Sequence, residues 1–196
     1  MFQGCGTAMV TPFRTDLSLD EEALRRLVQR QLEAGIHFLV PCGTTGENPT
    51  LSKLEQRRVV EITLEEAKGK VPVLAGAGGY DTAGVAAVAR EYEAMGADGI
   101  LSVTPYYNRP TSEGLYQHYR AIAQATRLPI VVYNVPGRTG TNVDPKTLAR
   151  LAGIDTVIGV KEASGNISQM AAIFQLVPED FLVLSGDDAI TIPLAA

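Results

Sequence analysis

Seven short apolar runs recur along the chain, with starts roughly 25 to 35 residues apart. They span residues 6–10, 37–41, 72–76, 99–103, 129–133, 156–160 and 181–185. Runs that are apolar at consecutive positions are typical of strands buried on both faces of a parallel sheet. Stretches with helical periodicity lie between them, at residues 20–34, 52–67, 82–95, 112–126, 144–151 and 166–176. The pattern therefore predicts a βα unit repeated seven times.

Residues at the ends of the predicted helices support these boundaries. Asp20 precedes a helix with acidic residues in its first turn, and Gly35 follows its end. Ser52 and Glu55 have the spacing of a capping box. Asp81 is a candidate cap for the third helix.

Two architectures use repeated βα units: the doubly wound sheet and the (β/α)8 TIM barrel. No GxGxxG follows the first strand, and the units are nearly uniform in length, which favours the barrel. A complete barrel needs eight units and about 250 residues. We therefore expect residues 1–196 to form a single α/β TIM-barrel domain, truncated after about seven βα units and lacking strand eight.

Composition narrows the class of protein. Hydrophobic residues make up 45% and charged residues 20%, a mixture that excludes intrinsic disorder. The net charge of −5 argues against a nucleic-acid partner, and no apolar run is long enough for a membrane span. Cys5 and Cys42 form neither a disulfide framework nor a zinc motif. We expect a cytoplasmic location.

Active sites of TIM barrels lie at the carboxyl ends of the strands. Lys161 directly follows the apolar run 156–160 and ends the sixth predicted strand, where burial would lower its pKa and free an amine to attack a carbonyl. The alternative is a structural ion pair with Glu162 or Asp187. Tyr133 ends the fifth run in the same way, either as a general acid/base or as a cap on the core.

Two further strand-end segments are candidates for binding an anionic substrate. GTTGE (43–47) places Thr44 and Thr45 on a glycine-flanked turn, where backbone amides can approach a carboxylate. Its alternative is an ordinary βα turn. Arg138 is suited to a substrate carboxylate or to a structural salt bridge.

The remaining reactive residues predict no second site. His37 and His118 have no assigned catalytic role, and Cys42 is interpreted as a small buried residue. Asp187 and Asp188 are interpreted as helix-capping residues rather than metal ligands. We expect no metal site.

Four segments together resemble the pyruvate-dependent class I aldolases, the family of N-acetylneuraminate lyase. They are GTTGE (43–47), TPYYNRP (104–110), YNVPGRT (133–139) and GVKEASGN (159–166). The resemblance covers all 196 residues in order. Because family members are longer, it implies that strand eight and a C-terminal helical region are absent here.

The resemblance implies a lyase that condenses pyruvate with L-aspartate 4-semialdehyde to give 4-hydroxy-tetrahydrodipicolinate, in lysine and diaminopimelate biosynthesis. Lys161 would form the Schiff base with pyruvate and Tyr133 would transfer protons. Thr44 would link Tyr133 to Tyr107 in a hydroxyl relay. No cofactor is implied, because the imine itself is the electron sink.

The same resemblance implies the substrate contacts and the assembly. Thr45 would hold the pyruvate carboxylate, Arg138 would hold the semialdehyde carboxylate, and Gly186 would contribute to substrate binding. In the family, the tyrosine at position 107 reaches in from a neighbouring subunit. This implies at least a dimer, and we expect a homotetramer (a dimer of dimers) for the full-length protein.

Two alternatives stay open. Sister enzymes, N-acetylneuraminate lyase and the keto-deoxy-sugar acid aldolases, share the lysine and the tyrosine. The lyase typically has serine where this chain has Thr44, and sugar-acid enzymes usually lack the arginine at position 138. The other alternative is an inactive fragment that self-associates through open strand edges.

Feedback by lysine is predicted to be weak or absent. In feedback-sensitive relatives the lysine site uses the positions of Asn48, Pro49, Lys53, Gln56, Tyr80, Gly84 and Tyr106. Gly84 stands where those relatives commonly carry a glutamate, and Lys53 adds a charge like that of the ligand's ammonium group.

Overall fold

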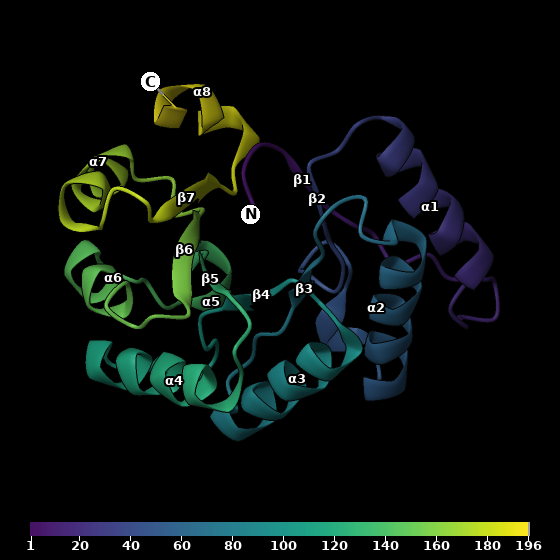
Figure 1. The fold of residues 1–196 in the computed structure, drawn as a ribbon. Helices are drawn as coiled ribbons and strands as arrows, with labels where there is room; N and C mark the ends of the chain where they lie inside the picture. The colour runs from purple at the N-terminus through teal and green to yellow at the C-terminus, as the bar shows by residue number, and fades with distance from the viewer. Residues whose placement is uncertain (196) are drawn as a thin grey trace. The chain divides into compact units, whose positions relative to one another are not determined.

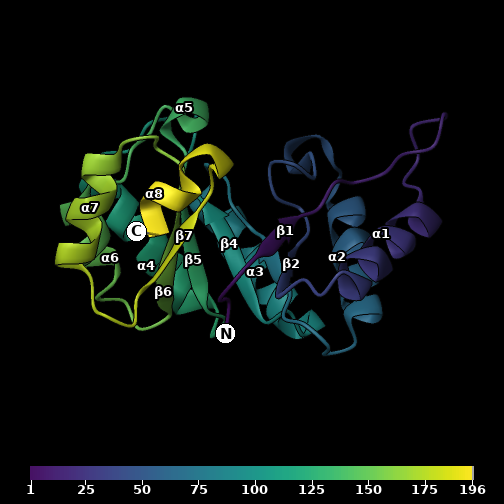
Figure 2. The ribbon, with the colours of Figure 1, turned by 90° about the horizontal axis from the view of Figure 1, so that it is seen from above.

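The computed structural model describes residues 1–195 and divides into two compact units (Figures 1 and 2). The first unit comprises Met1–Ala77 and Glu91–Leu101. The second comprises Gly78–Arg90 and the described residues from Ser102 onward. Strands and helices alternate along the chain, as the spacing of apolar runs predicts.

Within residues 1–195, seven strands occur, one at each predicted apolar run. They are β1 (Gly6–Ala8), β2 (Phe38–Val40), β3 (Leu74–Gly76), β4 (Gly99–Val103), β5 (Ile130–Asn134), β6 (Val157–Glu162) and β7 (Leu182–Ser185). The first three are shorter than predicted. In contrast, β5 and β6 each extend one residue past the predicted end, to Asn134 and Glu162. The extension places two more polar side chains at the strand ends.

The six predicted helices are confirmed within two residues at each end. They are α1 (Glu21–Glu33), α2 (Lys53–Ala67), α3 (Thr82–Met95), α4 (Ser112–Ala125), α6 (Pro145–Leu151) and α7 (Ile167–Leu176). The Asp20 side chain accepts from Ala23 N, and Ser52 and Glu55 form the predicted capping box. Each such cap stabilises its helix by about 1 kcal/mol.

Three short elements were not predicted: η1 (Asn48–Thr50), α5 (Pro136–Thr139) and α8 (Thr191–Ala195). A fourth, η2 (Asp188–Ile190), begins where a helix cap was expected, and Asp187 is its cap while Asp188 is its first residue. One helical turn is too short to show a hydrophobic period. In α5 the signals are local instead: Pro136 occupies the first turn, and Gly140 ends the helix with a φ of 68°.

The first unit contains parallel strand pairs. β1 pairs with β2, the bridge Leu39↔Val73 joins β2 to the segment before β3, and β3 pairs with the first half of β4. Gly6 is required at the first pair, because a Cβ there would lie 2.0 Å from the Phe38 ring. Leu24 and Val28 of α1, and Val60 and Ile62 of α2, are fully buried beside these strands.

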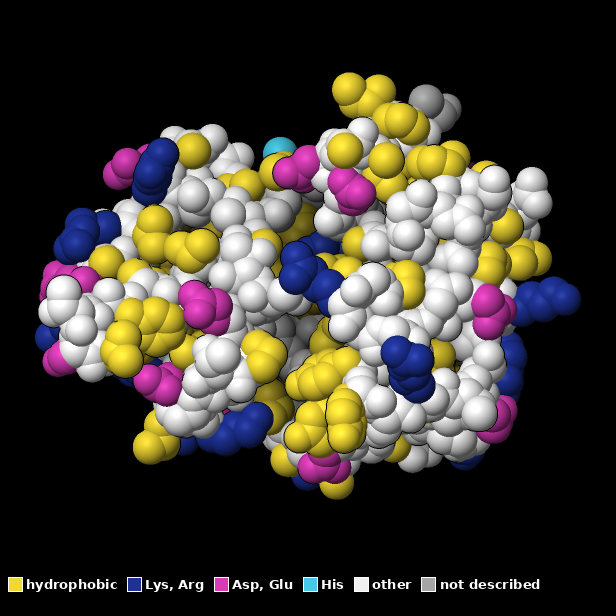
Figure 3. Space-filling model, turned by 180° about the vertical axis from the view of Figure 1, so that it is seen from behind, with side chains coloured by type: hydrophobic (Ala, Val, Ile, Leu, Met, Phe, Trp, Pro, Cys, Tyr) yellow, Lys and Arg dark blue, Asp and Glu magenta, His cyan; other side chains and the backbone are white. Residues whose placement is uncertain are grey.

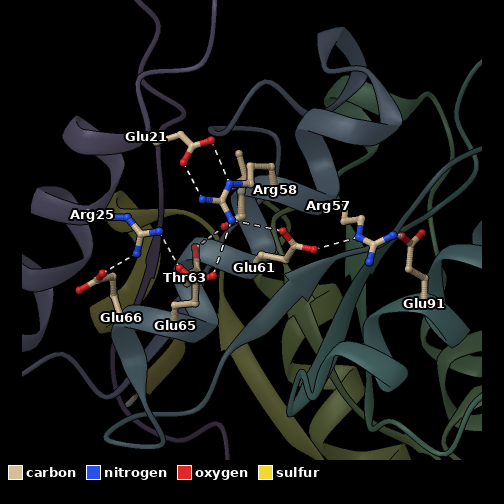
Figure 4. A network of polar contacts seen from close by, with 10 residues as sticks. Glu21, Arg25, Arg57, Arg58, Glu61, Thr63, Glu65, Glu66 and Glu91 are labelled. Atoms are coloured by element: carbon tan, nitrogen blue, oxygen red, sulfur yellow. Dashed lines mark hydrogen bonds and ion pairs between the residues drawn. The ribbon is translucent and has the colours of Figure 1, made fainter.

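An ion-pair network joins α1 to α2 in the first unit (Figure 4). Arg58 forms a two-pronged contact with Glu21, with Nε and Nη2 2.9 and 2.6 Å from the carboxylate oxygens. Arg25 donates to Glu65 and Glu66. These side chains are partly exposed, so each pair is worth only about 0.2–1 kcal/mol. The network fixes the contact between the two helices more than it adds stability.

In the second unit, β5, β6 and β7 pair in parallel. Helices α4, α6 and α7 lie side by side along this sheet (Figure 1). The core between them contains fully buried side chains from the three helices and from β5 and β6: Tyr119, Ile122, Leu148, Ile173, Ile130 and Val160.

Part of the second unit's surface is apolar. Phe174 and Leu176 of α7 and Ile192 of α8 are at least half exposed. Figure 3 shows hydrophobic side chains gathered around the C-terminal helix α8. None of the helices in the described residues is both long enough and apolar enough to cross a bilayer.

Candidate active site

The predicted lysine and tyrosine meet at the ends of neighbouring strands. Tyr133 of β5 and Lys161 of β6 are partners in the parallel pairing, and Lys161 Nζ lies 4.5 Å from the centre of the Tyr133 ring. This pairing depends on an irregularity between Ile130 and Val131, where the register shifts by one residue. Without that shift Tyr133 would face Val160. The irregularity therefore creates the pair.

The surroundings of Lys161 make its ammonium group easier to deprotonate. Burial lowers the pKa of Lys161 below its ordinary value, and the nearby Asp188 carboxylate only partly opposes this. The two carboxylates proposed as structural partners are engaged elsewhere. Glu162 accepts from Asn134 and from Ser164, while Asp187 accepts from Ala189 N as the cap of η2. Neither forms an ion pair with Lys161 among the described residues.

Gly186 lies against the Lys161 side chain. A Cβ at position 186 would be 2.9 Å from Lys161 Cε and 3.0 Å from Ala163 Cβ. Its amide donates to Glu162 O at 2.8 Å, which fixes the chain as it leaves β7. The absence of a side chain at 186 thus leaves room for the lysine.

Arg138 is presented by α5, directly after β5. Its side chain is exposed, whereas the neighbouring Thr139 is buried and donates to Val135 O and Thr141 O. Thr141 donates in turn to Pro105 O at 2.9 Å. The loop that carries Arg138 is therefore held by buried hydrogen bonds, with the guanidinium on the solvent side.

Tyr107 projects away from its own chain. Its side chain is 90% exposed, and its φ of 68° lies in the left-handed region that non-glycine residues seldom adopt. The adjacent Tyr106 packs edge-on against Tyr80, with ring centres 5.3 Å apart. Tyr107 is thus almost fully exposed, whereas Tyr133 is 7% exposed.

Thr44 and Thr45 belong to the first unit and are exposed. The GTTGE turn is closed by bonds from Gly46 N to Gly43 O and from Glu47 N to Thr44 O. A Cβ at position 46 would lie 3.0 Å from Met9 O, so the surrounding backbone would have to shift to accept a side chain there. The segment is thus a tight, glycine-dependent turn that presents two hydroxyl side chains.

The full sequence matches the Dihydrodipicolinate synthetase family over residues 1–196. The chain belongs to this family. It is 54% identical over 195 residues to the 4-hydroxy-tetrahydrodipicolinate synthase of Koribacter versatilis, covering 99% of this chain and 65% of that protein. The chain thus spans about two thirds of the length of the curated relatives that it matches.

Solved dihydrodipicolinate synthases have the same fold. The Thermotoga maritima enzyme is 49% identical and aligns with a TM-score of 0.97 over 100% of this chain and 67% of its own. The chloride-inhibited enzyme from Acinetobacter baumannii, solved in complex with pyruvate, is 41% identical with a TM-score of 0.97, covering 99% of this chain and 67% of its own. The TIM-barrel-type α/β fold predicted from the sequence is confirmed over the two thirds of these relatives that the chain covers.

Two other reactive side chains of this dihydrodipicolinate synthetase family member are buried. Cys42 is buried, as predicted, and burial raises the pKa of its thiol to about 12. His118 is buried in α4, with Nδ1 2.8 Å from Thr82 Oγ1. Among the described residues, no three His, Cys, Asp or Glu side chains gather as a metal site would require.

Sequence reasoning missed a polar pair next to the site. Asn134 and Glu162 follow Tyr133 and Lys161 directly, are completely buried, and are joined by a hydrogen bond of 2.9 Å. The sequence does contain a signal for this pair: Asn134 and Glu162 are polar residues that each directly follow a candidate catalytic residue at the end of an apolar strand. The predicted strands end at Tyr133 and Lys161, so both polar residues fall in the loops that follow them.

Proposed function

We propose that the protein condenses pyruvate with L-aspartate 4-semialdehyde through a Schiff base on Lys161. The observation that carries this proposal is the partly buried lysine amine, with a pKa lowered by burial, 4.5 Å from the ring centre of Tyr133. A neutral amine is the form that attacks a carbonyl. The relatives named 4-hydroxy-tetrahydrodipicolinate synthase support the same reaction.

The chemistry divides into four steps. The Lys161 amine attacks C2 of pyruvate, and loss of water leaves an iminium ion. The iminium withdraws electrons, so the methyl group gives up a proton and an enamine forms. The enamine carbon attacks the aldehyde carbon of the semialdehyde, and the aldehyde oxygen takes a proton. The amino group of the adduct then attacks the imine carbon and releases Lys161, closing the ring of 4-hydroxy-tetrahydrodipicolinate.

We assign the proton transfers to the hydroxyl group of Tyr133, because Tyr133 is the strand partner of Lys161. Thr44 and Tyr107 complete the hydroxyl relay implied by the family resemblance. The 90% exposure of Tyr107 supports a role in a neighbouring subunit rather than in its own. We therefore also propose that the full-length protein forms a homotetramer, built as a dimer of dimers.

Substrate contacts are assigned to three residues. Thr45 would hold the pyruvate carboxylate with its hydroxyl and amide, as the exposed GTTGE turn allows. Arg138 would hold the carboxylate of the semialdehyde, because an exposed guanidinium on a braced loop offers a two-pronged contact. Gly186 contributes by leaving space beside the lysine chain.

Borohydride trapping tests the proposal. The full-length protein is incubated with pyruvate, reduced, and analysed by intact mass and by peptide mapping. We expect one reduced pyruvyl adduct, located on Lys161. The exposed Lys146 provides a matched control, since Lys146→Ala should leave trapping unchanged. An adduct on another lysine would refute the assignment, and no adduct would favour the inactive, self-associating alternative.

The sugar-acid alternative is not favoured, because the curated relatives carry the synthase name. Turnover with the semialdehyde but not with a keto-deoxy sugar acid would distinguish the two. Three further statements remain predictions: a cytoplasmic location, a single TIM-barrel domain over residues 1–196, and weak or absent feedback by lysine. Two contacts bear on the prediction of weak feedback. Lys53 Nζ, whose charge is like that of the ligand's ammonium group, donates to Gln56 Oε1 at 3.0 Å. At Gly84, a Cβ would lie 2.8 Å from Asp81 Oδ2, so the space for a side chain there is already occupied.

A further inference from the structure

Asn134 and Glu162 lie on the opposite side of the strands from the proposed catalytic pair. Successive side chains of a strand point to opposite faces, so these residues point away from the face shared by Tyr133 and Lys161. They are also partners in the β5–β6 pairing, one position beyond that pair. Both side chains are 0% exposed. Two buried polar groups at this position need a specific set of hydrogen bonds.

Both carboxylate oxygens of Glu162 accept hydrogen bonds from N–H groups. Its Oε2 accepts from Asn134 Nδ2 at 2.9 Å, and its Oε1 accepts from Ser164 N at 2.8 Å. A carboxylate is an acceptor at both oxygens, which suits these two donors. The carboxylate therefore ties the end of β5 to the loop that follows β6.

Asn134 extends the connection to the loop that carries Arg138. Its Oδ1 accepts from Val143 N at 3.0 Å, and its Nδ2 also donates to Asn142 Oδ1 at 3.1 Å. Its backbone oxygen accepts from Ala163 N at 2.9 Å. The Asn134 side chain thus joins the segment that follows α5, at Asn142 and Val143, to the ends of β5 and β6.

We propose that Asn134 and Glu162 are positioning residues for the Schiff-base chemistry, a role that rests on the proposed function of Lys161. They contact no reacting atom. They act by holding the ends of β5 and β6 in register, which sets the distance between Tyr133 and Lys161, and by anchoring the Arg138 loop. Their buried hydrogen bonds make this arrangement rigid, because any mismatch leaves a buried polar group without a partner.

Exchanging the carboxylate and the amide provides the test. In Glu162→Gln, the new amide nitrogen faces Asn134 Nδ2, so two donors meet. Turning Asn134 over only moves the conflict to Val143 N. In Asn134→Asp, two carboxylates face each other with no donor between them. The double variant restores the bond between the two residues and the bonds to the backbone: Asp at 134 accepts from Val143 N and from the Gln at 162, whose oxygen accepts from Ser164 N. The bond from Asn134 Nδ2 to Asn142 Oδ1 is lost, so the exposed Asn142 must turn its amide over to donate to the Asp at 134.

Two measurements are made on the full-length protein for each variant. The first is the rate of pyruvate trapping, with its pH profile. The second is the pH dependence of acetylation at Lys161, which reports the state of the amine without pyruvate. We expect each single variant to slow trapping about tenfold and to shift the acetylation profile. The double variant should return to within about threefold of the wild-type rate.

Tyr119→Phe is the control for a general loss of stability. It removes a buried hydrogen bond of 2.9 Å, from the Tyr119 hydroxyl on α4 to Ser102 O on β4, whereas Lys161 lies on β6. It should lower the melting temperature and leave both Lys161 measurements unchanged.

Three results would overturn the proposal: single variants that match the wild type, a double variant no better than the singles, or an equal loss in Tyr119→Phe. If the wild type traps no pyruvate at Lys161, the proposed function fails. The acetylation profiles then still decide whether Asn134 and Glu162 position the lysine.

Discussion

Lys161 faces Tyr133 because the pairing of β5 and β6 shifts by one residue near Ile130. The resulting distance of 4.5 Å from Lys161 Nζ to the centre of the Tyr133 ring is therefore a property of two strand backbones. Side chains on paired strands are held more precisely than those on loops. The lysine can thus be replaced without removing the framework that holds it.

Lys161→Ala is expected to abolish pyruvate trapping while leaving the protein folded. The side chain is only partly buried and forms no ion pair within residues 1–195, so its removal breaks no buried contact of that kind. Intact mass after borohydride reduction measures the first effect, and circular dichroism measures the second. Persistent trapping in this variant would place the Schiff base on another amine.

Lys161→Met should change the pH dependence of stability. Because burial lowers the pKa of Lys161 in the folded state, the unfolded chain binds this proton more tightly. The ammonium therefore destabilises the wild type at neutral pH. Its cost fades as the pH rises from the lowered pKa toward the ordinary lysine value. We expect Lys161→Met to be the more stable protein at pH 7, with the difference shrinking toward high pH in urea titrations.

Arg138→Ala should separate the two substrates. Pyruvate trapping is expected to stay near the wild-type rate, whereas turnover with the semialdehyde should fall about ten- to a hundredfold, as for the loss of a charge-assisted contact. Arg138→Lys keeps the charge without the two-pronged geometry and should recover only part of the loss. An equal fall in trapping would mean that Arg138 supports the site as a whole.

His118 should make the protein sensitive to mild acid. Burial lowers the pKa of His118 to about 4, and Asp81 only partly offsets this. Because the folded state binds the proton less tightly than the unfolded state, the contribution of neutral His118 is complete above about pH 6.5 and is lost as the pH falls toward 4. The full loss is on the order of 3 kcal/mol.

His118→Gln tests this expectation. The variant cannot take up a proton, yet its amide can still bond to Thr82, which lies 2.8 Å from the histidine Nδ1. Denaturant unfolding at pH 7 and pH 4.5 should show a smaller acid-induced loss than in the wild type. Carboxylates elsewhere titrate in both proteins and cancel in the comparison. Parallel losses in the two proteins would refute the assignment to His118.

The strands and long helices were predictable because their signals are local. An apolar run or an Asp20 cap is read within a few residues, and the structure places both where the sequence indicates. The position of Lys161 was also readable, since a lysine directly after a buried run is unusual. The family resemblance then assigned roles that local patterns left open.

The register of β5 against β6 was not predictable in the same way. The partners Asn134 and Glu162 are 28 residues apart, and their meeting depends on the irregularity between Ile130 and Val131. Nothing in the run PIVVY marks that shift. The close approach of Gly186 to the Lys161 side chain was also not predictable. These residues are distant in sequence, and the only sign of their contact in the sequence is the glycine itself.

Gly186→Ala should slow Schiff-base formation without unfolding the protein. The added methyl group would stand 2.9 Å from Lys161 Cε and 3.0 Å from Ala163 Cβ, closer than carbon atoms pack. The lysine end is flexible and can move aside, so the loss of stability should be small. A displaced amine, however, should lower the trapping rate about ten- to a hundredfold. Trapping rates over a range of pyruvate concentrations separate the two interpretations of Gly186. A lower maximal rate with unchanged half-saturation is expected if the glycine makes room for the lysine, whereas weaker half-saturation alone would assign it to pyruvate binding instead.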